Sequence, residues 1–296
     1  MTARIAAVSP KTPETSVDQL ELFVAELIDV APKSDITSME YPIFALSKHP
    51  DTETFRYANP NNGAWLEILP SAAGRATIFD KDLLIYCISQ LAEAMNRGRP
   101  TGRRVRMNAY DYMVATGRNT SGREYQRLHD TLARLRGTTF KTNVSANGEL
   151  NQRGAVFGLI DDAEINMING RMTSLDITLG ERLFNAISDK RLLTYSRQYF
   201  QLSSPNERRM YEICRKHCGR QPIWEIGVEK LYDKFGTRGE LREFRRTLKK
   251  MIGTQPIPDY FLQYYPRGGS GATEKLVVEY DPEGQFKAEY AREIAP

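Results

Sequence analysis

The stretch TRGELREFRRTLKKMIG, Thr237 to Gly253, decides how the rest of the chain is interpreted. Thr237 and Glu240 have the spacing of a capping box, in which each side chain bonds the backbone amide of the other at a helix start. One apolar stripe recurs at helical spacing and predicts a core-facing side, formed by Leu241, Phe244, Leu248 and Met251. The opposite side is basic, and the helix over 228–235 stops at Gly236. This pattern predicts a helix–turn–helix that enters a DNA major groove; the alternative is a solvated amphipathic helix.

The same element occurs twice in the chain. Shifted by 116 residues, SGREYQRLHDTLARLRGT, from Ser121 to Thr138, lies over Thr237 to Thr254. Ser121 and Glu124 repeat the capping box, and the apolar stripe returns as Tyr125, Leu128, Leu132 and Leu135. The helix before this copy, over 109–116, ends at a glycine as well. A repeat of this length indicates a duplicated domain, because solenoid periods run to about 20–50 residues.

Composition gives broad limits to the fold and to the compartment. A chain of 296 residues, 41% hydrophobic and 26% charged, suits two globular domains with tails. No apolar run approaches the roughly 20 residues of a membrane span, and three unevenly spaced cysteines are typical of a reducing, cytoplasmic setting. The first 36 residues carry three basic and six acidic side chains, a net charge of −3. Because the net charge of the whole chain is +4, the remaining residues carry a net charge of +7. A moderately basic body suits a phosphate backbone.

Residues 1–36 are expected to form a flexible tail that contains a short apolar peptide. The peptide QLELF matches the Gln-Leu-x-Leu-Phe motif with which bacterial replication proteins hold the DNA polymerase sliding clamp; its residues are Gln19, Leu20, Leu22 and Phe23. The two large apolar side chains would fill a pocket while the glutamine bonds at its rim. The alternative is local docking, in which the segment forms an amphipathic turn against the first domain.

The remaining chain predicts an α+β protein of two tandem winged-helix domains, over 37–179 and 180–285, with a frayed tail over 286–296. In the first domain, short strands precede a helix from Asp80 to Met95. The hairpin of 139–143 with 155–160 is expected to be its wing, and a further hairpin turns at Asn169-Gly170. In the second domain, Ser204-Pro205-Asn206-Glu207 predicts a capped helix start, and strands over 260–265 and 275–280 form the second wing.

The two basic helices supply the candidate DNA-binding residues. In the first groove these are Arg123, Gln126, Arg127 and Arg134, and in the second Arg238, Arg242, Arg245, Arg246 and Lys249. Residues near each helix start are the expected base readers, since arginine pairs with guanine and glutamine with adenine. Phosphate contacts are predicted for Arg97, Arg99, Arg103, Arg104, Arg106, Lys141, Arg153 and Arg267.

The sequence offers little for catalysis. It has no Gly-x-x-x-x-Gly-Lys-Ser/Thr loop, and its three histidines are isolated from one another. Cys214, His217 and Cys218 are spaced for one helix face, but three ligands fall short of the four that structural zinc takes. We therefore expect a protein that is not an enzyme and that binds neither cofactor nor metal.

Three further segments carry a family resemblance: SMEYPIFALSK (38–48), ATIFDKDLLIYCISQ (76–90) and LRGTTFKTN (135–143). With them the chain resembles the plasmid replication initiator protein A family of proteobacteria. For iteron-type initiators, the resemblance implies winged-helix domains that bind direct repeats in double-stranded DNA at the plasmid origin. It also implies help in opening the origin, recruitment of the host initiator and replicative helicase, frequent repression of the protein's own gene, and a homodimer.

A second function class fits the same residues. A dedicated winged-helix transcriptional repressor would share the fold and never start replication. The clamp peptide separates the two hypotheses, because a repressor has no use for the sliding clamp.

Overall fold

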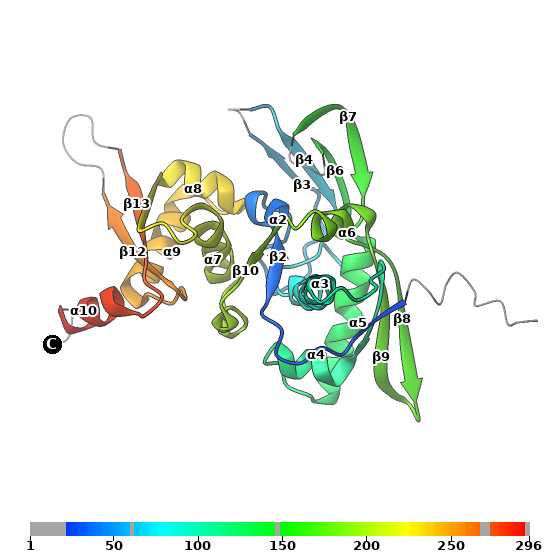
Figure 1. Ribbon diagram of the computed structural model, residues 1–296. Coiled ribbons are helices and arrows are strands. Elements are labelled where there is room, and N and C mark those ends of the chain that lie inside the picture. The colour runs from blue at the N-terminus through cyan, green and yellow to red at the C-terminus, as the bar shows by residue number, and fades with distance from the viewer. Residues whose placement is uncertain (1–21, 60–61, 146–148, 267–272, 294–296) are drawn as a thin grey trace, which may run out of the picture.

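The structure is a computed structural model that describes residues 22–59, 62–145, 149–266 and 273–293. Its helices and strands gather into two units that meet around α2, β2 and β10 (Figure 1). Two hydrophobic cores correspond to the two units. No helix within the described ranges has the length and apolar character needed to cross a membrane.

The first unit surrounds the buried helix α3 (Lys81–Asn96). Around it lie α2 (Ile36–Glu40), α4 (Ala109–Ala115), α5 (Gly122–Gly137) and α6 (Glu181–Ser188). One sheet has the order β1 (Leu22–Ala25), β5 (Arg104–Asn108), β9 (Arg171–Leu179), β8 (Ile160–Ile168). The other has the order β3 (Phe55–Ala58), β4 (Trp65–Leu69), β6 (Thr139–Val144), β7 (Leu150–Phe157).

The second unit is smaller. It contains η1 (Arg197–Gln201), α7 (Pro205–His217), α8 (Val228–Phe235), α9 (Leu241–Thr254) and α10 (Gln285–Glu293). Its sheet has the order β11 (Ile223–Gly227), β13 (Lys275–Tyr280), β12 (Tyr260–Tyr265). Between the units, β2 (Lys33–Asp35) pairs antiparallel with β10 (Leu192–Thr194).

The two units repeat one order of elements. In the first, α3, β5, α4 and α5 lead to the hairpin β8–β9, and in the second α7, β11, α8 and α9 lead to β12–β13. Each unit contains three antiparallel strands in which the strand that comes last in the chain lies in the middle. The orders are β5-β9-β8 and β11-β13-β12. The turns between the paired helices also match, since Gly117 and Gly236 are both left-handed, with φ of 66° and 64°. This agreement supports the duplication inferred from the sequence.

The predicted apolar stripes are buried, but the predicted capping boxes do not form. Leu128, Leu132 and Leu135 of α5 are buried and Tyr125 is half-buried. In α9 the stripe residues are buried except for half-buried Leu241. The side chain of Ser121 makes no capping bond, and neither does that of Ser204 at the start of α7. Helix α9 begins only at Leu241, with Glu240 at the N-cap, and the Thr237 hydroxyl accepts from the Gly239 amide at 3.3 Å.

The hairpin predicted as the first wing belongs to a different sheet. β6 and β7 pair with each other, but β6 also pairs with β4, so this hairpin completes the sheet β3-β4-β6-β7. The hairpin that joins β5 is β8–β9, which turns at Asn169 and Gly170 as predicted, both with positive φ. Residues 146–148, between β6 and β7, lie outside the described residues.

Three of the predicted boundaries need correction. Residues 22–36 of the expected tail form β1, β2 and the start of α2. Helix α6, assigned to the second domain, places Leu183 and Ile187 in the core of the first unit. Most of the expected C-terminal tail is the helix α10, whose Phe286 ring lies 6.2 Å from that of Phe261.

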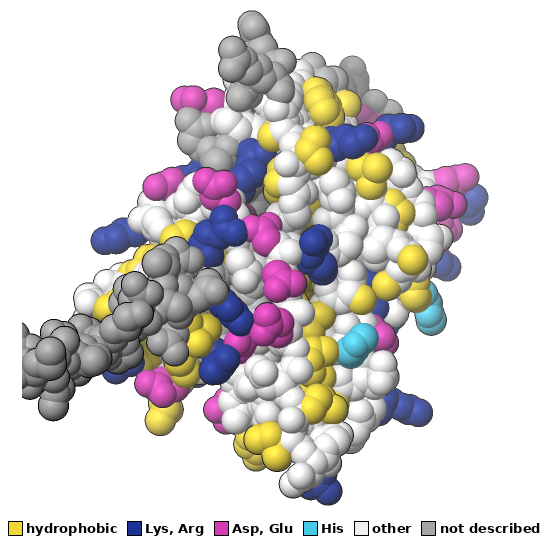
Figure 2. All heavy atoms as spheres, turned by 90° about the vertical axis from the view of Figure 1, so that its right-hand side faces the viewer, with side chains coloured by type: hydrophobic (Ala, Val, Ile, Leu, Met, Phe, Trp, Pro, Cys, Tyr) yellow, Lys and Arg dark blue, Asp and Glu magenta, His cyan; other side chains and the backbone are white. Residues whose placement is uncertain are grey.

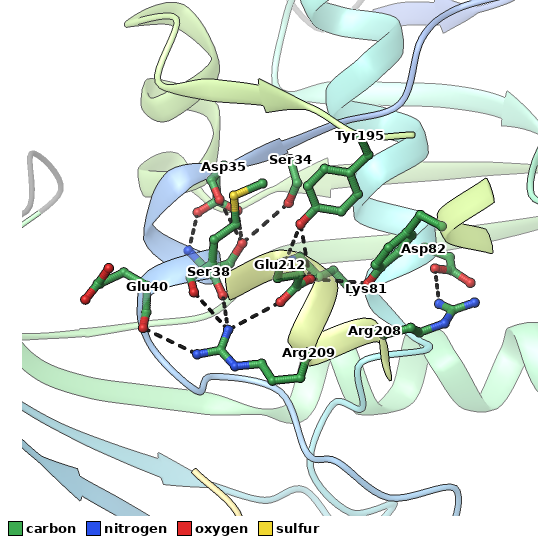
Figure 3. Close-up of polar contacts among 12 residues, drawn as sticks. Ser34, Asp35, Ser38, Glu40, Lys81, Asp82, Tyr195, Arg208, Arg209 and Glu212 are labelled. Atoms are coloured by element: carbon green, nitrogen blue, oxygen red, sulfur yellow. Dashed lines mark hydrogen bonds and ion pairs between the residues drawn. The ribbon is translucent and has the colours of Figure 1, made fainter. Parts of the chain in front are cut away.

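The two units are joined by a buried polar network, the interunit seam, formed by Lys81, Asp82, Arg208, Arg209 and Glu212 (Figure 3). Lys81 at the start of α3 contacts Glu212 of α7 at 2.5 Å, and the Tyr195 and Tyr199 hydroxyls donate to the same carboxylate. The Asp82 carboxylate pairs with the guanidinium groups of Arg208, at 2.5 Å, and of Arg118, at 2.8 Å. Because such charges are costly to bury unless they are paired, the seam holds α3 and α7 in one relative position.

A second cluster extends the contact at its edge. Arg209 donates to the carbonyls of Met39 and Lys234, at 2.9 and 2.6 Å, which ties α7 to the ends of α2 and α8. The Glu40 carboxylate accepts from Lys216 and, at 2.6 Å, from Lys234. Burial alone would raise the pKa of Glu40, but hydrogen bonds from His217, Lys216 and Lys234 outweigh it and lower this pKa strongly. The carboxylate therefore stays ionised at the junction.

We predict that Glu212→Gln destabilises the chain by about 3–5 kcal/mol, because it leaves the Lys81 ammonium buried without its counter-charge. The measurement is the free energy of unfolding from urea titration. Glu243→Gln is the control, since its pair with Arg246 lies on the exposed face of α9 and should contribute less than about 1 kcal/mol. Equal losses in the two variants would contradict the role given to the seam.

Candidate nucleic-acid interface

Helix α9 presents a row of cations to solvent. The apolar stripe fixes its rotation by burying Phe244, Leu248 and Met251, which turns Arg242, Arg246 and Lys249 outward. Arg246 keeps 82% of its side-chain exposure while pairing with Glu243, and the Lys249 ammonium lies 5.4 Å from the ring centre of Tyr264. No ion pair to Arg242 is found among the described residues. These side chains can reach a polyanion without first breaking a buried contact.

Helix α5 presents the corresponding face of the first unit. Arg123, Gln126 and Arg127 are exposed in its first turns, and Arg127 pairs with Glu124 one turn earlier. In the alignment of the repeat, Gln126 occupies the position of Arg242. Both helices therefore show a hydrogen-bonding side chain at the same outward position, although α5 carries fewer cations there than α9.

Arg134, predicted to read DNA, is instead part of the interior of the first unit. Its guanidinium donates two hydrogen bonds to Asp80, at 2.7 and 2.8 Å, and only 17% of the side chain is exposed. The hydrogen bonds to Asp80 raise the pKa of Arg134. Asp80 also accepts from Thr131 and from the Thr77 amide, so it connects α5 to the start of α3 rather than capping a helix.

Two of the cations predicted on the second recognition helix are also paired. Arg245 contacts Glu274 of the hairpin at 2.8 Å, and that carboxylate accepts in addition from the Tyr264 hydroxyl. Burial and the neighbouring Glu274 raise the pKa of Tyr264 to about 12. Arg238 lies before α9 rather than in it and reaches across to Asp51 and Glu53 of the first unit. Both arginines therefore position α9 rather than projecting from it.

Most arginines of the run before α4 are paired with acidic side chains of their own unit. Arg104 and Arg106 point to the outer side of the β5-β9-β8 sheet, where both pair with buried Asp176. Arg103 pairs with Asp161, and Arg97 with Glu93 on α3. Figure 2, which shows this side of the molecule, has dark blue and magenta side chains side by side rather than one basic patch. Arg99 is exposed, and no ion pair to it occurs in the described part of the chain.

Of the remaining predicted phosphate contacts, Lys141 is paired with an acidic side chain, whereas Arg153 and Arg267 stay predictions. Lys141 lies on β6 and pairs with Glu67 of β4 at 3.3 Å, on the sheet that does not contain β5. The backbone of Arg153 belongs to β7. Arg267 lies outside the described residues.

The described part of the clamp-like peptide, Leu22 and Phe23, is not free in the folded chain. Gln19 and Leu20 lie outside the described residues, whereas Leu22 and Phe23 form part of β1, which pairs in parallel with β5. Phe23 is 6% exposed and belongs to the core of the first unit. The segment therefore docks locally, as the alternative stated, but as a strand rather than as an amphipathic turn.

Some exposed cations were missed by the sequence analysis. Lys250 of α9 and Arg136 in the last turn of α5 are both exposed. Their exposure could have been predicted from the sequence, because each residue lies on the polar side of a helix whose apolar stripe was already identified. The partners Asp51, Glu53 and Asp80 carried no comparable local signal, since they lie far along the chain from the arginines they bind.

The helical cysteine–histidine group is part of the second core. Cys214 and Cys218 are buried there, and burial raises the pKa of the Cys218 thiol to about 11. His217 instead stacks on Trp224, with ring centres 5.1 Å apart. Within the described ranges, no group of three or more histidine, cysteine, aspartate or glutamate side chains is placed to hold a metal ion.

Comparison with known proteins places the chain in the class of replication initiators. The sequence profile of the family described as "Replication initiator protein A" matches residues 33–262. The chain belongs to the replication initiator protein A family, which confirms the resemblance seen in its sequence.

Two known proteins illustrate the likeness. A protein of Wigglesworthia glossinidia brevipalpis named "Putative replication protein" is 37% identical over 249 residues, which cover 82% of this chain and 89% of that protein. The crystal structure of domains 2 and 3 of RctB, determined on selenomethionine derivatives, has a TM-score of 0.60 and covers 84% of this chain and 99% of that one. At 13% sequence identity, the second likeness concerns the fold alone.

We predict that Arg134→Ala lowers the free energy of unfolding by about 3 kcal/mol, because it leaves the buried Asp80 carboxylate with too few donors. Arg123→Ala, on the exposed side of the same helix, should change stability by less than about 0.5 kcal/mol. Urea unfolding of both variants gives the comparison. A neutral Arg134→Ala would return this residue to the candidate DNA contacts.

Proposed function

We propose that this initiator binds duplex DNA sequence-specifically, with α5 and α9 each lying in a major groove of the same molecule. The supporting observation is the repeated unit, which twice turns a polar helix face outward, with Gln126 and Arg242 at the same position. We further propose that each unit is a winged helix, with β8–β9 and β12–β13 as the wings. The interunit seam supports action as one body, because it joins the two units through buried ion pairs.

The proposed target is a set of short direct repeats at a plasmid origin. The proposed DNA contacts are Arg123, Gln126, Arg127, Arg242, Arg246 and Lys249, with Arg136 and Lys250 as additional phosphate contacts. Arg99, Arg153 and Arg267 stay predicted phosphate contacts. Two recognition helices on one face of a duplex would address sites about 10 base pairs apart. The protein would act without catalysis of its own, by distorting the origin and recruiting the host initiator and replicative helicase, and it would repress its own gene when the repeats overlap the promoter.

We predict that Arg242→Ala weakens binding to the preferred duplex by about 1–3 kcal/mol and relaxes the preference at one base pair. The preferred duplex is first selected from a pool of random 30-base-pair DNA with the purified full chain. Binding is then measured by fluorescence anisotropy on that duplex and on each single-base substitution within it. The expected result is a weaker preference at one position, together with unchanged selectivity elsewhere.

Arg292→Ala is the charge-matched control, since Arg292 is exposed on α10 and belongs to neither of the two helices in the proposal. It should lose little affinity and no selectivity. If Arg242→Ala and Arg292→Ala lose the same affinity on preferred and random DNA, α9 does not read bases. If the wild type selects no duplex from the pool, the proposed function is wrong.

Clamp binding remains a proposal for a state in which β1 has left its sheet, because Phe23 is otherwise in the core. We predict that Gln19→Ala/Leu20→Ala abolishes capture of the chain on immobilised bacterial sliding clamp and leaves the melting temperature unchanged. These positions precede β1, so the substitutions leave the sequence of that strand unchanged. Undiminished capture by this variant, or no capture of the wild type, would contradict clamp binding.

A further inference from the structure

The turn between α8 and α9 is seated directly on the first unit. A Cβ atom added to Gly236 would lie 2.3 Å from the Cβ of Pro42 and 3.1 Å from the ring of Phe55. Both neighbours belong to the first unit, where Phe55 is the first residue of β3. Side-chain carbons do not approach each other so closely, so the second unit can sit where it does only because residue 236 has no side chain.

The corresponding turn of the first unit is open. Gly117 has φ of 66°, within two degrees of Gly236, yet a Cβ atom there would meet nothing within 4 Å. The two glycines thus have the same backbone conformation in the two copies of the repeat. They differ in their surroundings, since an added Cβ atom would meet the other unit at Gly236 but not at Gly117.

Arg238 fastens the same turn to the first unit. Its guanidinium pairs with Glu53 and, at 3.2 Å, with Asp51, and it donates to the carbonyls of Glu53 and Thr54 at 3.0 and 3.3 Å. It is 37% exposed, so this contact forms the accessible rim of the interface. A guanidinium held by two carboxylates and two carbonyls is directed toward the protein, and this argues against its predicted role on DNA.

The acceptors of Arg238 are themselves fixed within the first unit. Buried Arg75 donates to Asp51 at 2.6 Å, its amide donates to the Asp51 carbonyl at 2.7 Å, and its guanidinium stacks 4.8 Å from the Phe55 ring centre. Phe55 in turn faces Gly236. The contacts form a closed loop, which we call the joint, made of Pro42, Asp51, Glu53, Phe55 and Arg75 with Gly236 and Arg238.

The joint lies next to the start of α9. Arg238 precedes Leu241, the first residue of that helix, by three positions. Successive base pairs of a duplex are about 3.4 Å apart along the helix axis, so a shift of a few ångströms in the start of α9 corresponds to a shift of about one base pair on DNA. A contact that fixes this point therefore bears on which DNA sites both helices can occupy together.

From this geometry we propose that the joint sets the spacing between the two half-sites that α5 and α9 bind. The joint makes no DNA contact itself; Gly236 and Arg238 are positioning residues that act through α9. This inference rests on the proposed function, because it requires both helices to bind one duplex. It adds that specificity for spacing resides at a protein–protein contact between the units.

The matched pair Gly236→Ala and Gly117→Ala tests the proposal. Both substitutions place a side chain at a left-handed glycine and carry the same backbone strain, but only the first drives a methyl group into Pro42 and Phe55. The full chain is used with the duplex selected for the wild type, with insertions and deletions of one to five base pairs between its two halves. Affinity for each spacing is measured by fluorescence anisotropy, and melting temperatures are compared in parallel.

The wild type and Gly117→Ala should share one preferred spacing, with affinity falling about tenfold or more one base pair away. Gly236→Ala should shift or broaden the preferred spacing while binding an isolated half-site as the wild type does. Should Gly236→Ala fail to fold, Arg238→Ala and Glu53→Ala provide the test, since each releases the rim contact without inserting bulk. They should broaden the spacing preference.

Two results would overturn the inference alone: an unchanged spacing preference in the folded joint variants, or the same change in Gly117→Ala. A wild type that binds duplex with only one of its two helices would remove the proposed function together with this inference. If the wild type binds two half-sites equally well at every spacing, the proposed function is retained. The joint then does not determine the spacing between the half-sites.

Discussion

The paired charges at the interunit seam are the constraint on which the rest of the arrangement depends. Lys81, Asp82, Arg208 and Glu212 are all buried, and each has its partner in the other unit. Breaking such a pair leaves a charge inside the protein, which costs far more than breaking an exposed one. A duplicated unit could have been joined by a flexible linker, but here the two copies are held as one body through side chains of α3 and α7.

The two copies differ in how they use this arrangement. The first keeps an open turn at Gly117, while the second uses the same turn, at Gly236, to contact its neighbour. The first also holds an extra hairpin, β6–β7, within a sheet that has no counterpart in the second unit. In the proposed function, the pair acts as one two-part surface for DNA rather than as two independent binding units.

Sequence reasoning predicted helices well and charged side chains poorly, for a physical reason. The stripes of α5 and α9 are set by local spacing, so burial of Leu128 or Leu248 could be predicted from the residues nearby. Arg134 pairs with Asp80, which is 54 residues away in the sequence, and Arg238 pairs with Glu53, which is 185 residues away. No local pattern therefore distinguishes these two arginines from free cations. The two hairpins after α5 were equally ambiguous, because strand periodicity does not indicate which hairpin pairs with β5.

The central claim is that α5 and α9 lie on one duplex at the same time, and directed DNA cleavage tests it most directly. The native cysteines are buried, so an iron chelate attached to Ala133→Cys on α5 or to Gly253→Cys on α9 would label one exposed position at a time. On the selected duplex, the account predicts that the two probes cut at two separate places about 10 base pairs apart. Cutting from only one helix, or from both at the same base pairs, would contradict it.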